Sequence, residues 1–467
     1  MSVTRLKPAP DLGPADGPFY VAAEKIYPRE ISGRFTHLRQ AAVIALLGLF
    51  YGVAWLRWDG HQAVLFDLPA RKFHLFGLTL WPQDFLYLAL LLIIAALSLF
   101  FFTALAGRLW CGYACPQTVW TELFVWIEQW TEGPRSRRMK LDRGPWTAEK
   151  VLRKSLKQTL WVALAAWTGF TFVGYFTPIR TLGGDIMAFA LGPWSTFWIA
   201  LYGLATYGNA GFLREQVCKY MCPYARFQSA MFDKDTLVIS YDAARGEPRG
   251  ARRRGTAARS VGLGDCIDCT LCVQVCPTGI DIRNGLQYEC IACGACIDAC
   301  DEVMDKMGSP RGLIRYTTEH ALHGRATHLV RPRMLVYAAL LLTVTGSLFY
   351  SLVTRMPLIL DVIRDRNALY REVRGERIEN AYALKIINLD DRAHTYRVSV
   401  SGMEGLELSA PSQPITVPPG SVSNIPARLA APAARAGGVH RIALTVAAVD
   451  APRITVRENT RFIGPTP

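Results

Sequence analysis

Eight cysteines arranged in two identical sets carry the strongest chemical signal in this sequence. Each set reads C-x-x-C-x-x-C-x-x-x-C, and a proline follows the first set. The sets are Cys266, Cys269, Cys272 and Cys276, and then Cys290, Cys293, Cys296 and Cys300. This spacing wraps three thiolates around one cubane iron–sulfur cluster and sends the fourth thiolate to the neighbouring cluster. The sequence therefore predicts two [4Fe–4S] clusters as cofactors.

In this pattern the last cysteine of each set binds the cluster of the other set, which defines the expected ligands. One cluster would be held by Cys266, Cys269, Cys272 and Cys300, and the other by Cys290, Cys293, Cys296 and Cys276. Two structural zinc sites are the alternative, but such sites usually show two C-x-x-C pairs separated by a longer loop. The pattern resembles that of a bacterial two-cluster ferredoxin, except that Asp301 stands where the second set would carry proline.

A second cysteine system lies outside this region. The hexapeptides at 111–116 and 218–223 share C-x-Y-x-C-P and supply Cys111, Cys115, Cys218 and Cys222. With spacing of i and i+4, each pair is expected on one face of a helix. Four soft thiolates favour Cu(I), zinc or an iron–sulfur cluster, and Met221 would add a thioether that suits Cu(I). The alternative is that these cysteines are buried apolar residues at packed helix ends.

Five apolar segments are candidates for membrane helices by length and apolarity. The fourth is interrupted by Gly and Pro, which membrane helices tolerate. Trp and Tyr at the segment ends favour membrane helices over buried helices of a soluble core. The predicted spans are 38–56, 84–106, 156–176, 194–207 with its apolar flanks, and 334–353.

The net charge of +14 is carried largely beside the apolar segments, which indicates a membrane surface and not nucleic acid as the partner. The loop after the second segment is rich in Lys and Arg, whereas the loop after the third holds only Arg180. The positive-inside rule therefore places the N-terminus and the cluster region in the cytoplasm. An odd number of spans then places the C-terminal part in the periplasm of a bacterial inner-membrane protein. The run Arg252–Arg254 is interpreted as a solvated linker at anionic lipid.

Composition divides the chain into five parts, and the predicted fold class is a multidomain membrane protein. Short alternating strands after the last helix predict an immunoglobulin-like β-sandwich, which would follow a five-helix transmembrane bundle and a ferredoxin-like domain. No apolar run precedes the first helix, so no cleavable signal peptide is predicted. The parts are a polar N-terminal segment (1–37), four membrane helices with both hexapeptides (38–240), a basic linker with the cluster domain (241–331), the fifth helix (332–355) and the sandwich (356–467).

The whole chain resembles the FixG/CcoG (RdxA) family. The resemblance rests on membrane hairpins that end in C-x-x-x-C-P, the two-cluster segment and the outer β-domain, in that order. Shorter matching pieces lie at 226–228, 245–250 and 311–316. The resemblance implies a role in assembly of cbb3-type cytochrome c oxidase, with reduction of Cu(II) to Cu(I). It implies that the thiols of the two hexapeptides handle copper, as substrate or transient ligand, and that oxidase subunits or copper-delivery proteins are the partners.

Two other functions stay open at this stage. The membrane half is also similar to the NapH-type quinol dehydrogenases, which implies a quinol-oxidising electron-transfer subunit without metal delivery. The third hypothesis is a scaffold that holds oxidase subunits through the sandwich. Its clusters would serve only folding. The sequence leaves open whether the four hexapeptide thiols meet within one chain or across a homodimer. A metal reductase is the first hypothesis, since thiolates stabilise Cu(I) over Cu(II).

Overall fold

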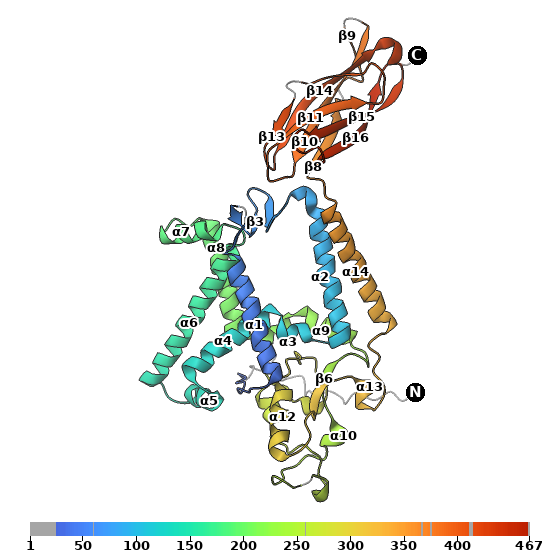
Figure 1. Cartoon of the computed structure of the whole chain (residues 1–467). Helices are drawn as coiled ribbons and strands as arrows, with labels where there is room; N and C mark the ends of the chain where they lie inside the picture. The colour runs from blue at the N-terminus through green and yellow to red at the C-terminus, as the bar shows by residue number, and fades with distance from the viewer. Residues whose placement is uncertain are drawn as a thin grey trace, which may run out of the picture.

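The computed structural model describes residues 25–465, except 59, 257, 366–367, 374–375 and 411–413 and the side chains at 83, 226 and 229. Most of the predicted N-terminal segment therefore lies outside the described residues. A helical middle part separates a β-sandwich at one end of the molecule from the cysteine-rich region at the other (Figure 1). The two predicted soluble domains thus sit at opposite ends of the helices.

Long helices connect the two ends. Helix α1 and helix α14 run from the cysteine-rich end towards the sandwich, and α2 runs back beside α14 (Figure 1). The helices are α1 (Arg34–Val53), α2 (Phe85–Ala106), α3 (Leu109–Tyr113), α4 (Pro116–Glu132), α5 (Arg135–Arg143), α6 (Ala148–Val173), α7 (Ile179–Met187), α8 (Pro193–Thr206), α9 (Pro223–Met231), α10 (Ala243–Gly246), α11 (Leu271–Gln274), α12 (Ala295–Met307), α13 (Glu319–Leu322) and α14 (Pro332–Val353).

Three helices of the described residues, α1, α2 and α14, are long and apolar enough to cross a bilayer. They cover three of the five predicted spans, and the protein is accordingly a membrane protein. The predicted span at 156–176 lies in α6, whose first turns carry several charged residues. The span at 194–207 lies in α8, which has 14 residues and continues as a π-helix, η2 (Tyr207–Leu213). The charged residues of α6 and the short length of α8 explain why these two helices are less clearly membrane spans than α1, α2 and α14.

Helices α6 and α8 pack through glycine. A Cβ on Gly169 would lie 2.3 Å from the carbonyl oxygen of Ile199, and one on Gly203 would lie 3.3 Å from that of Ala165. Small residues at a crossing allow close backbone approach, which is the usual mode of helix association in membranes. The α6–α8 contact therefore has the character of a membrane helix pair.

The predicted sandwich is present and consists of two antiparallel sheets. Strands β12-β14-β10-β8, with β9 paired to β10, face strands β13-β11-β15-β16. Side chains that alternate along the strands fill the space between the sheets, and Leu384, Tyr396 and Phe462 are fully buried there. The strands are β8 (Leu358–Arg364), β9 (Arg371–Val373), β10 (Arg377–Asn388), β11 (His394–Ser401), β12 (Glu407–Ser409), β13 (Ile415–Val417), β14 (Val422–Pro432), β15 (Val439–Ala448) and β16 (Thr455–Ile463).

Short strands between α1 and α2 connect the sandwich to the helices. The Trp81 indole donates a hydrogen bond of 3.3 Å to the Leu389 carbonyl, and Arg355 pairs with Asp84 at 2.6 Å. These strands are β1 (Arg57–Trp58), β2 (His61–Gln62), β3 (Val64–Asp67), β4 (Lys72–Leu75) and β5 (Leu78–Leu80).

One strand crosses the boundary expected at residue 240. Strand β6 (Val238–Tyr241) pairs with β7 (Ile314–Thr317) and closes the cysteine-rich region on itself. That region therefore begins at Val238, because the ladder with β7 ties this strand to it.

A buried histidine in the sandwich predicts a pH-dependent stability. The His394 ring lies 2.6 Å from Asp450 and 3.0 Å from Asp390. Burial lowers the pKa of His394, but these carboxylates outweigh burial and leave its pKa above 6.5. The added stability, about 1 kcal/mol, is complete below the unfolded pKa and is lost as pH rises through the raised pKa. Hydrogen–deuterium exchange of β11 in the full chain, corrected for intrinsic rates, should accelerate over that pH range.

The matched control for this prediction is His440 in the same sheet, whose ring contacts the Gly437 carbonyl at 2.8 Å. His394→Gln should abolish the pH dependence, and His440→Gln should preserve it. An exchange profile of His394→Gln that still followed pH like the wild type would contradict the assignment.

Candidate functional site

Two cavities in the cysteine-rich region are lined by the predicted ligands. The first cavity is lined by the thiols of Cys266, Cys269, Cys272 and Cys300. The second is lined by Cys276, Cys290, Cys293 and Cys296, and also by Cys272, which lines both cavities. The first cavity thus combines three cysteines of the first set with Cys300, and the second combines three cysteines of the second set with Cys272 and Cys276.

The loops around the two cavities repeat the same backbone conformation. Asp268 and Thr270 have φ of 55° and 56°, and the corresponding residues Ala292 and Gly294 have φ of 54° and 78°. A non-glycine residue in the left-handed region costs about 1 kcal/mol, so its occurrence at matching places indicates a constraint on the loop. The short helices α11 and α12 begin directly after these turns. The repeated turns direct three thiols of each loop into one cavity.

The donor sets suit a cluster better than a single ion. Within the described part of the chain, no three His, Cys, Asp or Glu side chains lie close enough together to hold one metal ion. Four thiols around a cavity fit a cubane, whose iron atoms keep the ligands apart, whereas a tetrahedral zinc site needs four donors around one point.

Burial makes the thiols of both groups poor acids before metal binds. It raises the pKa of Cys272, Cys290 and Cys300 to about 12 each. Ligation requires thiolates, so loading of these sites releases protons.

The cysteine-rich region caps the first membrane helix. The Asp298 carboxylate, on α12, accepts hydrogen bonds from the backbone N–H and the hydroxyl of Thr36 at 2.7 and 2.8 Å. Gly33 precedes α1, and a Cβ there would lie 2.3 Å from Cγ of Asp298. A carboxylate at a helix N-terminus satisfies unpaired N–H groups and complements the helix dipole. The contact ties α1 to the helix that carries Cys300.

Loss of this cap should loosen the junction. Asp298→Ala is expected to cost about 1 kcal/mol and to speed hydrogen–deuterium exchange in the first turn of α1. Asp305→Ala is the control, because Asp305 lies on the same helix but pairs with Arg311 at 2.7 Å. Equal hydrogen–deuterium exchange in the first turn of α1 in both variants would contradict the proposed role of Asp298 as its cap.

The first hexapeptide packs directly on the second cysteine group. Cys111, on α3, belongs to a cluster of apolar side chains with Ile291, Cys293 and Cys296. A Cβ on Gly112 would lie 2.7 Å from the Ile291 carbonyl oxygen, so only glycine permits this approach. The first hexapeptide and the segment that carries Cys290, Cys293 and Cys296 therefore share one packed interface.

The hexapeptides do not form the single helical turns that i and i+4 spacing suggested. Helix α3 ends at Tyr113, and Cys115 and Cys222 are extended residues that precede α4 and α9. The reason is the following proline, which disfavours helical conformation in the residue before it and occupies the first position of the next helix. The expectation of one shared helix face is therefore wrong.

The tertiary fold nevertheless brings the two hexapeptides together. The Cys111 thiol interacts electrostatically with the thiols of Cys115, Cys218 and Cys222. Met221 lies outward, with 60% of its surface exposed, so the structure does not support its expected role as a metal ligand. The thiols of the two hexapeptides therefore lie near one another within one chain, although no three of them lie close enough together in the described residues to hold one ion.

Two buried residues near the thiols were not predicted from sequence. The Arg108 guanidinium donates to the carbonyls of Ala225 and Tyr288 and interacts electrostatically with Cys111 and Cys290. The side-chain oxygen of Gln228 lies 3.3 Å from Sγ of Cys111. Gln228 falls in the family-matching piece 226–228, whereas Arg108 carries no sequence signal beyond its place before the hexapeptide. A buried cation between the thiols and the second cysteine group stabilises negative charge on both.

The first arginine of the run in the linker, Arg252, is part of the domain, whereas Arg253 and Arg254 are exposed. Arg252 exposes 2% of its side chain and donates to the Gly264 carbonyl at 2.7 Å and the Ser309 hydroxyl at 3.1 Å. Its charge is used within the cysteine-rich region, which corrects the expectation of a solvated linker for this residue.

Three family models match the chain. A model described as a 4Fe-4S dicluster domain matches residues 213–319, and one described as an IG-like fold at the C-terminal of FixG matches 348–465. A model described as a 4Fe-4S binding domain matches 88–138, which contains Cys111 and Cys115.

Relatives match over most of their length. The chain is 39% identical over 434 residues to the nitrogen fixation protein FixG of Rhizobium meliloti, which covers 85% of this chain and 83% of that protein. It is 43% identical to protein RdxA of Cereibacter sphaeroides, over 84% of this chain and 85% of that protein. The ferredoxin-type protein NapH of Haemophilus influenzae is 23% identical over 60% of this chain and 91% of its own. A crystal structure of a FixG-related protein from Vibrio parahaemolyticus aligns with 34% identity and a TM-score of 0.21, over 23% of this chain and 95% of that one.

Proposed function

Because the chain belongs to the FixG and RdxA family of iron–sulfur electron-transfer proteins, we propose that it reduces Cu(II) to Cu(I) at its hexapeptide thiols. The Cu(I) would serve assembly of a cbb3-type cytochrome c oxidase, with oxidase subunits or copper-delivery proteins as partners. The observation that carries the proposal is the packing of Cys111 against the buried cluster that includes Ile291 and Cys293, with Gly112 against the Ile291 carbonyl.

The proposed ligand sets follow the two cavities. Cys266, Cys269, Cys272 and Cys300 would hold one cluster, and Cys276, Cys290, Cys293 and Cys296 the other. When bound, the clusters supply one-electron transfer. Reduction of Cu(II) takes one electron and no proton, so it matches a one-electron donor.

The chain's own residues would bind copper and balance its charge. No three of the thiols at 111, 115, 218 and 222 lie close enough together in the described residues to hold one ion, so a pair of them would bind the copper. Soft thiolates bind Cu(I) better than Cu(II), which favours the reduction. Burial raises the pKa of Cys111 to about 12, so binding of copper displaces protons from this group. Arg108 offsets the negative charge that remains after the thiols ionise.

The proposed topology keeps five membrane helices in a bacterial inner membrane. Helices α6 and α8 run between the same two ends of the molecule as α1, which supports their crossing (Figure 1). The basic loop that contains α5 lies at the cysteine-rich end, so that end would face the cytoplasm and the sandwich the periplasm. Impermeant thiol reagents test this orientation through introduced cysteines at exposed positions. Lys306→Cys on α12 should react only in inverted vesicles, and Val439→Cys in the sandwich should react in intact cells.

A transfer experiment tests the proposed reaction. The chain is reduced with dithionite, freed of excess reductant and mixed with Cu(II), while the cluster spectrum and a Cu(I) chelator are followed. The wild type should lose its reduced-cluster signal as Cu(I) forms. Cys111→Ala and Cys218→Ala should slow this about 10- to 100-fold. Met221→Leu, on the same turn as Cys218, should react normally, because Met221 points outward.

The proposal fails if Cys111→Ala and Cys218→Ala bind and reduce copper like the wild type. Clusters that cannot be cycled would instead favour the scaffold function. Clusters that a quinol reduces while copper is neither bound nor reduced would favour a quinol-oxidising subunit of the NapH kind.

The family match at 88–138 favours a second candidate, an additional cluster at the four hexapeptide thiols. The match contains only two cysteines, so Cys218 and Cys222 would have to complete the ligand set. Iron analysis of anaerobically purified protein separates the two candidates, with about eight iron atoms per chain for two clusters and about twelve for three.

A further inference from the structure

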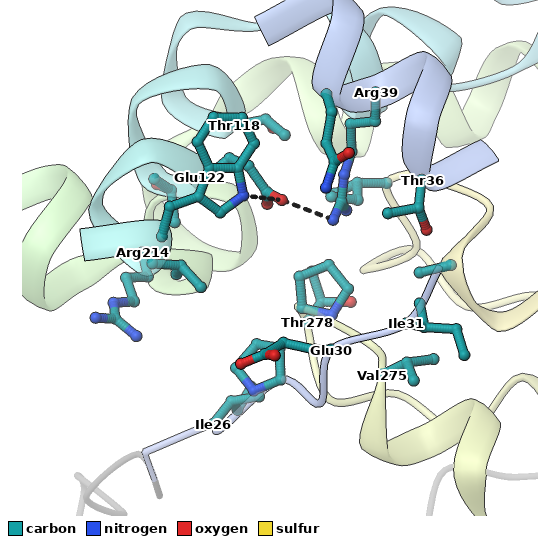
Figure 2. A pocket seen from close by; sticks show the side chains of 18 of the residues that line it. Ile26, Glu30, Ile31, Thr36, Arg39, Thr118, Glu122, Arg214, Val275 and Thr278 are labelled. Atoms are coloured by element: carbon teal, nitrogen blue, oxygen red, sulfur yellow. Dashed lines mark hydrogen bonds and ion pairs between the residues drawn. The ribbon is translucent and has the colours of Figure 1, made fainter. Parts of the chain in front are cut away.

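A cavity of about 660 Å³ lies where the first membrane helix meets the cysteine-rich region (Figure 2). Its walls come from the segment before α1, from α1 and α4, from the turn that carries Cys218, and from loops around the cysteines. The volume falls within the range of sites for small organic molecules.

The cavity is separated from the second cysteine group by single side chains. Thr278 and Ile291 line both this cavity and the one that holds the thiols of Cys276, Cys290, Cys293 and Cys296. Arg39, on the opposite side, interacts electrostatically with Cys293. A molecule in the cavity would therefore lie beside the second cluster.

The charges of the lining favour a neutral ligand. Three arginines and three glutamates line the cavity, so it carries no excess that would select an anion or a metal cation. Arg39 pairs with Glu122 at 3.0 Å, and Figure 2 shows this pair across from Thr278 and Ile31. The charged residues are Arg29, Arg39, Arg214, Glu30, Glu122 and Glu215.

One wall of the cavity reaches the lipid-facing surface. Ile44 lines it and exposes 65% of its surface on α1, one of the apolar spans. Val125 and Trp126 add apolar area on α4. Hydrogen-bonding groups are also present, since Arg39 is 91% buried and its Nε has no partner among the described residues. Apolar walls with a few convergent polar groups suit a ring with oxygen substituents and an apolar tail.

We infer that this cavity binds the headgroup of a lipid-soluble quinone. The inference rests on the proposed function, for which it names the electron source. A quinol bound there would release two electrons and two protons on becoming quinone. Two one-electron clusters match the two electrons, and the carboxylates of Glu122 and Glu215 offer acceptors for protons on the way to water.

Binding of decylubiquinone to the purified, cluster-loaded full chain tests the inference. Gln40 lies on α1 in the lining, and Gln40→Phe fills part of the cavity. Leu38→Phe is the matched control, since Leu38 is 51% exposed and lies outside the lining. Titration calorimetry should show that Gln40→Phe weakens binding about tenfold or more, with wild-type affinity for Leu38→Phe and unchanged iron content in both.

Wild-type affinity of Gln40→Phe, or no binding of decylubiquinone to the wild type, would overturn the inference. An azidoquinone photolabel adds a second readout, because it should mark peptides 26–44 and 117–129, and labelling confined to other helices would also overturn it. Copper reduction by dithionite-reduced Gln40→Phe should stay normal. Failure of quinone binding alone would thus leave the proposed function intact, whereas loss of copper reduction in the wild type would remove the proposed function.

Discussion

Replacement of Cys300 by alanine is expected to remove the cluster of the first cysteine set and to leave that of the second. Cys300 belongs to the second set in sequence but lines the cavity of Cys266, Cys269 and Cys272. A buried cluster that loses one of four thiolates loses a covalent anchor and becomes open to solvent. Iron and sulfide should fall from about eight to about four atoms of each per chain.

The reciprocal variant is the control for this prediction. Cys276→Ala should also halve the iron, but it should remove the other cluster, because Cys276 lines the cavity of the second set. The two variants should therefore retain different electron paramagnetic spectra whose sum resembles that of the wild type. Cys266→Ala should leave the same residual spectrum as Cys300→Ala, since both residues line the first cavity. A Cys300→Ala spectrum that instead matched that of Cys290→Ala would show that each set holds its own cluster without exchange of ligands.

Substitution of Gly112 by valine should disconnect the thiols from the second cluster without removal of any ligand. The first carbon of the new side chain would lie 2.7 Å from the Ile291 carbonyl oxygen, so α3 and the cysteine loop must separate. Electron transfer weakens steeply with distance. The oxidation of reduced clusters by Cu(II) is expected to slow about 10- to 100-fold, as for outer-shell changes at metal sites. Stopped-flow absorbance of the pre-reduced chain measures this rate, and iron content reports that the clusters remain.

Gly48→Val serves as the matched control, because a Cβ on Gly48, in α1, meets no atom within 4 Å. It should transfer electrons at the wild-type rate. A wild-type rate in Gly112→Val with normal iron content would show that electrons reach copper by a route other than this interface.

Local patterns were predictable where a short loop determines its own shape. Three cysteines within seven residues allow few backbone conformations that direct all three thiols to one side. The left-handed conformation at 268, 270, 292 and 294 is the one that both loops adopt. The sandwich was predictable for a similar reason, since alternation of apolar and polar residues selects a face of each strand. The hexapeptides were misread because helical spacing was extended through Cys115 and Cys222, although the next proline disfavours helix at each.

The sequence by itself determined the two cysteine sets, three apolar spans, the β-sandwich and the likeness to the FixG and RdxA proteins, because each is encoded in residues close together in the chain. Only the tertiary structure decided that Cys111 lies on the second cysteine group, that Asp298 caps α1 and that Arg108 stands between the thiols and Cys290. These contacts join residues more than 170 positions apart, and no local spacing encodes which distant surface a helix end will meet. Tertiary packing selects the partner surface. Gly112 allows the Ile291 carbonyl to approach α3, and the Asp298 carboxylate accepts two hydrogen bonds from Thr36.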